Sequence, residues 1–323
     1  MSKVDRNDPK RSLASESTYS LIEFVREFGD DAACLDFLWR ERYAPDGSHA
    51  HCPKCDRERK FHRVSSRPSY SCDTCGKHLH PTAGTIYHRS ATSLHLWFYA
   101  SYLMTSTRCG ISAKQLEREL GVGYKTAWRM ATLIRNQLMP QDDERPLSGH
   151  VEADETWIGG KPTAGETARA AKLRRFPTDR RSYAIKPKTS VFAAVERGGR
   201  VRATVVPDSS AATLGMYVRE YVLPEARLIT DEFRSYDMVG REYVAHDRIN
   251  HGQRVYVSGD VHTNTVEGFF GNLKRGISGN YHSVSPKWLQ GYLNEFVWRY
   301  NHRRDDRAMF LTLISRSAVA VDG

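Results

Sequence analysis

Two Cys-x-x-Cys pairs constrain this chain more than any other feature. The pairs are Cys52 with Cys55 and Cys72 with Cys75, and sixteen residues separate them. Each pair can direct two thiolates at one ion, and a gap of ~15–20 residues allows a hairpin to complete a tetrahedral zinc site. A closed four-thiolate site has no open position for catalysis, so we interpret the zinc as structural. An iron site or redox chemistry is the alternative.

The N-terminal residues and the charge set the expected surroundings. Residues 1–17 are polar and lack the apolar run of a secretory signal, so we expect a disordered tail and a reducing compartment, in which cysteines bind metal rather than pair. The apolar stretches are too short for a membrane helix. The 323 residues carry a formal charge of +10, which favours a nucleic acid as partner.

One segment holds most of that charge. Residues 161–188 contain nine Lys or Arg against two acids. We interpret the segment as a basic insertion between two strands that contacts nucleic acid. An ordinary solvated loop is the alternative.

The stretch ISAKQLERELGVGYKTAWRMATLIRNQL predicts a helix-turn-helix, with the turn at residues 121–123. An apolar helix over 93–106 precedes it. The second helix of the helix-turn-helix would present polar side chains to DNA, although two packed helices would give the same pattern. These side chains are Tyr124, Lys125, Thr126, Arg129 and Arg135.

Composition and periodicity divide the chain into successive parts. They are the disordered tail (1–17), a zinc-ribbon domain with N-terminal helices (18–90), the helix-turn-helix region (91–139), a linker (140–147), an α/β domain (148–305, with the basic insertion at 161–188) and a C-terminal tail (306–323). In the α/β domain we predict strands at 150–158, 190–196, 201–206 and 227–230, and helices at 209–222, 263–275 and 286–303.

Three carboxylates in this α/β domain are candidate metal ligands. Asp154 lies on a predicted strand, Asp231 at the end of another and Glu267 on a predicted helix. Oxygen ligands suit Mg²⁺ or Mn²⁺, and two such ions can activate a water and stabilise the leaving oxygen of a phosphodiester. Glu152 shares a strand face with Asp154 and could support it, although nothing in the sequence makes Glu152 a ligand.

Several motifs resemble the DDE transposases of bacterial insertion sequences, specifically the Merlin-related group with an N-terminal zinc ribbon. The resemblance runs from about residue 20 to residue 303 and rests on CPKC…CDTC, EADETWIGGK, ITDEFRSY, HTNTVEGFFGNLKRG and YHSVSPKWLQGYLNEFVWRYNHR. It implies a ribonuclease-H-like mixed five-stranded sheet flanked by helices. Its metal-binding acids match Asp154, Asp231 and Glu267, and its basic residue matches Lys274. Some members have an asparagine as the third residue, so Asn264 is an alternative to Glu267.

The resemblance also implies a function. We expect a transposase that binds terminal inverted repeats and catalyses phosphodiester hydrolysis and strand transfer with two Mg²⁺ or Mn²⁺ ions. Its partner would be double-stranded DNA (transposon ends and target), bound by at least a homodimer at the bacterial nucleoid in the cytoplasm. The alternatives are a domesticated regulator that does not cut, or a nuclease without strand transfer. The expected DNA contacts are Lys125, Arg129, Lys172, Arg174, Arg175, Lys274 and Arg275.

Two cysteines lie outside the pairs. Cys34 and Cys109 have no partner in the sequence pattern, and we expect both to be buried thiols.

Overall fold

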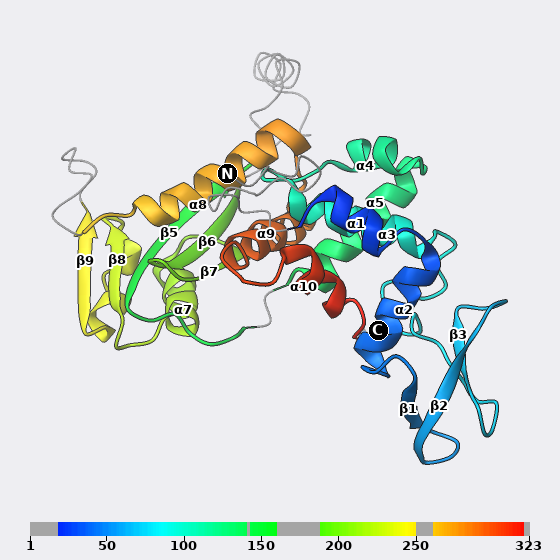
Figure 1. The fold of residues 1–323 in the computed structure, drawn as a ribbon. Helices are drawn as coiled ribbons and strands as arrows, with labels where there is room; N and C mark the ends of the chain where they lie inside the picture. Colours follow the sequence, from blue (N-terminus) through cyan, green and yellow to red (C-terminus); the bar gives the residue numbers. More distant parts are fainter. Residues whose placement is uncertain (1–18, 141–142, 160–187, 250–260, 320–323) are drawn as a thin grey trace, which may run out of the picture. The chain divides into compact units, whose positions relative to one another are not determined.

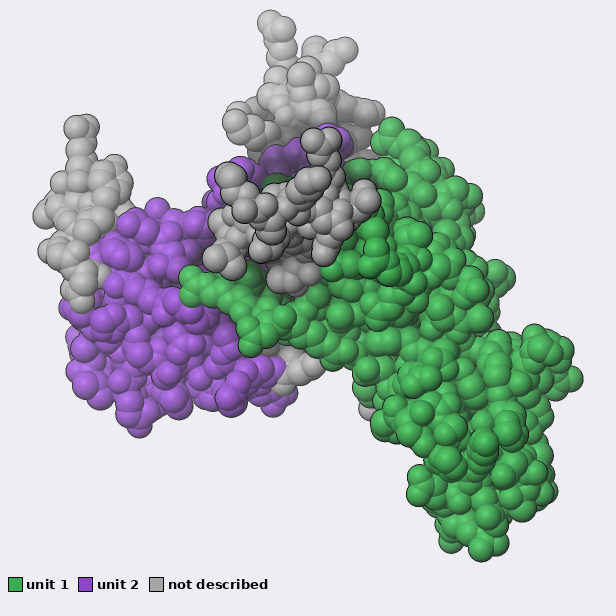
Figure 2. Space-filling view, in the orientation of Figure 1, with its two compact units in different colours: residues 1–138, 302–323 green, residues 139–301 purple. Residues whose placement is uncertain are grey.

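The computed structural model describes residues 19–140, 143–159, 188–249 and 261–319 (Figure 1). It contains two compact units (Figure 2): unit 1 comprises Met1–Leu138 and His302–Gly323, and unit 2 comprises Met139–Asn301. Each unit is considered by itself. The predicted N-terminal tail and all of the basic insertion except Lys188 lie outside the described residues. No helix of the described ranges is both long and apolar enough to cross a membrane.

Unit 1 begins with two short helices, as the sequence predicts. Helix α1 (Leu21–Glu27) starts at Ser20, whose side chain forms a capping box with Glu23. Asp30 caps α2 (Asp31–Arg42). A four-stranded antiparallel sheet follows, in the order β1 (His49–Cys52), β2 (Arg57–Val64), β3 (Ser69–Cys72) and β4 (His78–Leu79). This sheet carries the cysteine pairs.

The helix-turn-helix forms where the sequence predicts it. Helix α3 (Leu94–Ser106) precedes α4 (Ala113–Leu120) and α5 (Tyr124–Leu133), which continues as a π-helical turn at Ile134–Leu138. Gly121 ends α4 with φ +65°, a left-handed conformation that side chains disfavour. The prediction that Arg135 faces DNA is wrong: the side chain is 3% exposed and donates to the Ile111 carbonyl. Arg135 follows the exposed Arg129 by six residues, which is not a whole number of helical turns, so the two side chains face different ways.

The prediction of a C-terminal tail over 306–323 is also wrong. Helix α10 (Met309–Arg316) buries Phe310, Leu313 and Ile314, which share one face at helical spacing. Phe310 packs against the rings of Tyr19, Phe24, Phe28 and Tyr102. The chain therefore returns to unit 1 from His302, and α10 completes its core.

Unit 2 is built on a mixed sheet in the order β7-β6-β5-β8-β9 (Figure 1). Strands β5 (His150–Ile158), β6 (Thr189–Glu196) and β7 (Val201–Val206) pair antiparallel, whereas β8 (Arg227–Asp231) and β9 (Ala245–Ile249) join parallel to β5. The confirmed fold class is thus a mixed sheet flanked by helices, preceded by a four-cysteine module. As predicted, the first candidate acid lies on the first strand of this sheet and the second on the fourth.

Side-chain alternation divides the core of unit 2 into two layers. Helix α7 (Ala211–Tyr221), capped by Ser210, packs on the sheet face that contains Val151, Phe192 and Leu228. Helices α8 (Asn264–Gly276) and α9 (Pro286–Asn301) pack on the opposite face, which contains Val191. Short 3₁₀ turns at Arg234–Tyr236 and Val239–Glu242 precede β9, and a π-helical turn at Ile277–Tyr281 follows α8.

Candidate active site and zinc centre

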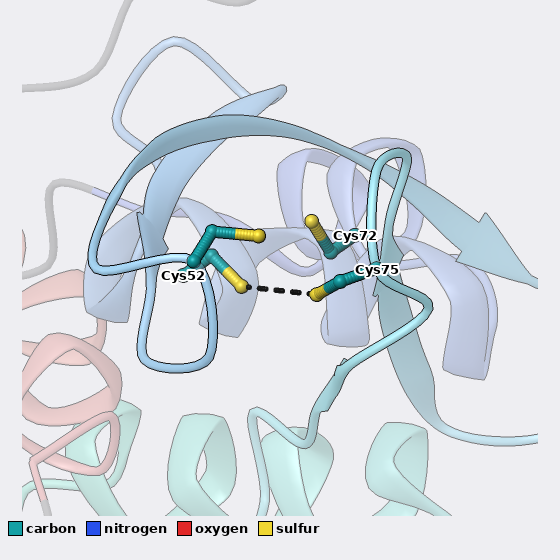
Figure 3. Close-up of side chains that lie close together, drawn as sticks. Cys52, Cys72 and Cys75 are labelled. Atoms are coloured by element: carbon teal, nitrogen blue, oxygen red, sulfur yellow. Dashed lines mark hydrogen bonds between the residues drawn. The ribbon is translucent and has the colours of Figure 1, made fainter.

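The four paired cysteines converge in unit 1. Their sulfur atoms all lie within 4.8 Å of one another, and the Sγ atoms of Cys52 and Cys75 are 3.5 Å apart (Figure 3). Tetrahedral zinc with Zn–S bonds of ~2.3 Å would hold sulfurs about 3.8 Å apart. The group therefore has the donor set and the spacing to bind zinc.

The electrostatics of Cys52 suit a thiolate. Burial raises the pKa of this thiol. The backbone N–H groups of Cys55 and Lys54 and the neighbouring thiols together lower the pKa by more than burial raises it, and the result is about 6. In Cys75 the Lys77 N–H lowers the pKa, but burial and the other three thiols raise it overall, so the four thiols share protons that a bound metal ion would displace.

A small aromatic core supports this sheet. Trp39 of α2 stacks on Tyr70 of β3 with ring centroids 4.1 Å apart, and both side chains pack with Phe61, Cys52 and Cys72. Of the two remaining cysteines, Cys34 is buried as predicted, but Cys109 is exposed. The prediction for Cys109 is wrong because the residue lies in the loop between α3 and α4, outside the apolar helix faces.

In unit 2, strand pairing places two of the candidate acids side by side. Glu152 of β5 pairs with Ile229 of β8 in a parallel register. Asp154 and Asp231 each lie two residues further along, so the same register brings them opposite each other, with Asp154 in the middle of β5 and Asp231 at the end of β8. The alternation of side chains puts both on the sheet face covered by α8 and α9.

Helix α8 carries the third candidate acid on its exposed side. Glu267 lies in the first turn, where the buried hydroxyl of Thr263 donates to its Oε1 at 2.8 Å. Lys274 is also exposed and follows by seven residues, which are two helical turns, so it shares the face of Glu267. Asn264 is exposed at the first position of the helix.

The three acids affect one another electrostatically. Burial raises the pKa of Asp154 to about 8, and the negative charges of Glu155, Asp231 and Glu267 contribute in the same direction. The backbone N–H of Glu155 donates to Asp154 at 2.8 Å and opposes this effect. A divalent cation would relieve this repulsion, so these hard oxygen donors fit Mg²⁺ or Mn²⁺ chemically. Within the described ranges, however, only the four cysteines have three or more ligand atoms within 4.8 Å of one another.

Glu155 has a different environment from Asp154. It points to the α7 side of the sheet and accepts a hydrogen bond from the buried Tyr236 hydroxyl at 2.7 Å. Burial raises the pKa of Glu155, and burial together with the Glu155 charge raises that of Tyr236. Tyr236 is the last residue of the ITDEFRSY motif, but no role was predicted for it; it approaches Glu155 through the turn after β8.

Comparison with known proteins finds a family match for unit 2. Residues 146–301 match the family model of the ISXO2-like transposase domain, which covers nearly all of unit 2. The chain is 32% identical over 260 residues to an uncharacterized protein in transposable element ISH50 of Halobacterium salinarum. That match covers 77% of this chain and 84% of the relative. The chain belongs to the insertion-sequence DDE transposases.

A second relative of this transposase is shorter. It is an uncharacterized transposase-like protein of Haemophilus influenzae, 32% identical over 103 residues. The match covers 32% of this chain and 82% of the relative. The similarity to the ISH50 protein covers more residues than the transposase domain, so it also includes part of unit 1.

The transposase's predicted DNA contacts can be placed only in part. Lys125 and Arg129 are exposed on α5, and Lys274 and Arg275 are exposed near the end of α8. Lys172, Arg174 and Arg175 lie outside the described residues. The predicted contacts thus belong to separate surfaces on the two units.

Glu152 is the residue whose role the sequence left most open. It is 0% exposed, and its carboxylate faces the start of α8 rather than solvent. Its partner Arg197, from the turn between β6 and β7, was not predicted. No motif in the sequence marks this arginine, because its contacts join segments far apart in the chain.

Proposed function

We propose that this chain is a DDE-type DNA transposase that binds the terminal inverted repeats of its insertion sequence, cleaves at each end and joins the ends to target DNA. One observation carries the proposal. Asp231, at the end of β8, and Glu267, on the covering helix, are both close enough to Asp154 in the middle of the adjacent parallel strand to raise its pKa.

The three carboxylates would hold two divalent cations. Bound Mg²⁺ or Mn²⁺ would supply activation of a water and stabilisation of the leaving oxygen. Asp154 and Asp231 would provide ligands from the rigid sheet, and Glu267 would complete the set, with Asn264 as the alternative third ligand. Lys274, on the same helix face, would contact a phosphate and orient the DNA strand.

The reaction needs no covalent enzyme intermediate. In the first step, water attacks the phosphorus at a transposon end, and the 3′ oxygen leaves as a free hydroxyl. In the second step, this 3′-OH attacks a phosphorus of the target and expels the target's own 3′ oxygen. Each step is an in-line displacement at a different phosphorus with the same geometry, so one set of carboxylates can serve both steps.

Unit 1 would supply recognition of the DNA ends. The exposed Lys125 and Arg129 begin the second helix of the helix-turn-helix, the usual position for contacts in the major groove. The zinc-bound sheet and the basic insertion would add contacts to phosphates. Joining two ends at one target implies at least a dimer in the DNA complex, and we expect the protein to act at the nucleoid.

The test is cleavage of a duplex that carries the element's own ends, with Mg²⁺ or Mn²⁺ present. Asp154→Asn, Asp231→Asn and Glu267→Gln should each abolish cutting and joining while binding to the ends persists. Glu225→Gln is the matched control, because this exposed acid precedes β8 at the opposite end of the strand from Asp231.

Each other outcome points to a different function. A wild type that binds ends but never cuts would be a regulator, and one that cuts without joining would be a nuclease. Cutting that survives Glu267→Gln but not Asn264→Ala would move the third ligand to the asparagine.

A further inference from the structure

Glu152 fixes the N-terminus of α8 to the central strand of the sheet. Its Oε2 accepts from the backbone N–H groups of Thr265 at 2.7 Å and Val266 at 3.0 Å. Its Oε1 accepts from the Thr265 hydroxyl at 2.8 Å. A single buried carboxylate therefore satisfies backbone donors in the first turn of a helix that lies far along the chain.

Arg197 holds this carboxylate in place. Its Nε lies 2.6 Å from Glu152 Oε1, and its Nη2 donates to the carbonyl of His262 at 2.8 Å. The backbone of Arg197 is itself fixed, since its N–H donates to the carbonyl of His150 at 3.0 Å. One guanidinium thus connects β5, the turn after β6 and the segment that enters α8.

Helix α8 depends on this external contact. The residue before the helix, Thr263, makes no side-chain capping hydrogen bond to the helix backbone. The Thr263 hydroxyl instead donates to Glu267, the third candidate acid. The helix start is therefore capped by Glu152 from the sheet, and Thr263 remains available to orient Glu267.

We propose that Glu152 and Arg197 form a positioning pair that places Glu267 against Asp154 and Asp231. The inference deepens the proposed function and rests on it. Glu152 and Asp154 lie two residues apart on one strand face, so the pair ties the start of α8 beside the first acid. Loss of the pair would loosen the third ligand without removing any ligand.

The first measurement uses metal-free protein. Hydrogen exchange of a peptide spanning residues 261–270 should accelerate about tenfold or more in Glu152→Gln, because glutamine has one acceptor oxygen where the carboxylate has two and cannot accept from both Arg197 and the α8 backbone amides. Thr265→Val is a milder second variant that removes one hydroxyl contact to Glu152 Oε1 and keeps the side-chain shape. We expect it to give a smaller change in the same peptide.

The second measurement titrates the full-length protein with Mn²⁺, by calorimetry for binding and by cleavage of the end duplex. Glu152→Gln and Arg197→Lys should raise the half-saturating Mn²⁺ concentration about 10–100-fold, and saturating Mn²⁺ should restore most of the cleavage rate. A purely structural defect would lower the cleavage rate at saturating Mn²⁺ and leave the half-saturating Mn²⁺ concentration unchanged.

Glu295→Gln is the matched control. Glu295 is also 0% exposed and paired with an arginine, Arg299 of its own helix α9, and it accepts from Tyr281. The Glu295→Gln variant should leave the half-saturating Mn²⁺ concentration and the hydrogen exchange of residues 261–270 at wild-type values. A wild-type midpoint in Glu152→Gln would overturn the positioning role alone. A wild type that neither binds Mn²⁺ nor cuts would overturn the proposed function as well.

Discussion

Replacing Asp154 with asparagine should stabilise unit 2 when no divalent cation is bound. The wild-type carboxyl is held at a pKa of about 8 by burial and by the charges of Glu155, Asp231 and Glu267, against an ordinary value of 3.8. At pH 7 the folded protein must therefore keep a proton that the unfolded chain releases. An amide at this position has no charge to lose and avoids that cost.

The size of the effect follows from the two pKa values. Each unit of difference between the folded and unfolded pKa values corresponds to about 1.4 kcal/mol. The raised pKa of Asp154 therefore lowers the free energy of unfolding by about 4 kcal/mol at pH 7 and by about 1.5 kcal/mol at pH 5. This cost disappears below pH 3.8, where both states are protonated, and stops growing above about pH 8. Since asparagine keeps some cost of desolvation, we expect a gain of ~1–4 kcal/mol at pH 7.

The assay should report on unit 2 alone, because two compact units make a single unfolding midpoint ambiguous. Hydrogen exchange of peptides from β5 and β8 at increasing urea, without added Mg²⁺ or Mn²⁺, gives the local free energy of unfolding. Glu225→Gln serves as control and should change it by less than ~0.5 kcal/mol. The prediction is wrong if the Asp154→Asn protein is no more stable than the wild type, or if its gain in stability is the same at pH 5 and pH 7.

Three further predictions concern unit 1. The Cys72→Ser variant should bind no zinc, measured by atomic absorption, and the sheet around the site should lose its protection from hydrogen exchange, as we also expect for the wild type after chelation. Phe310→Ala should destabilise unit 1 by ~3–5 kcal/mol, because four aromatic rings lose their partner. Urea-dependent hydrogen exchange of α3 peptides measures the change, and the control Val319→Ala, at an exposed position, should leave the stability unchanged. Arg129→Ala should weaken binding to the end duplex and, if it contacts a phosphate, reduce the slope of log affinity against log salt by about 1.

Much of the sheet in unit 2 could be predicted because its strands have clear local signals. The predicted bounds of 150–158 and 201–206 match β5 and β7, and the Gly198–Gly199 pair marks the hairpin before β7. Ser210, at the start of the predicted helix over 209–222, caps α7. These features depend on alternation and turn chemistry, which neighbouring residues encode.

The elements that were missed have weak local signals. Strand β9 (AHDRI) fully buries only Ile249 and lies at the sheet edge, so it shows no alternating pattern. Helix α10 is only eight residues long, and its stability comes from packing against aromatic rings near the other end of the chain. Arg135 and Cys109 were misjudged for a related reason, since burial depends on tertiary packing rather than on residue type.

Two of the three acids of β5, Glu152 and Asp154, show why a candidate site cannot be completed from sequence. Glu152 and Asp154 are both acidic, two residues apart and on one face, and periodicity treats them alike. In the structure Glu152 is 0% exposed with backbone, hydroxyl and guanidinium partners, whereas Asp154 faces other carboxylates, which raise its pKa. A carboxylate paired with a guanidinium stabilises the fold as it stands, whereas a buried carboxylate among like charges gains from a cation. The distinction requires Arg197 and the start of α8, which arrive at β5 only through long-range packing, so the division of roles between the two acids becomes visible only in three dimensions.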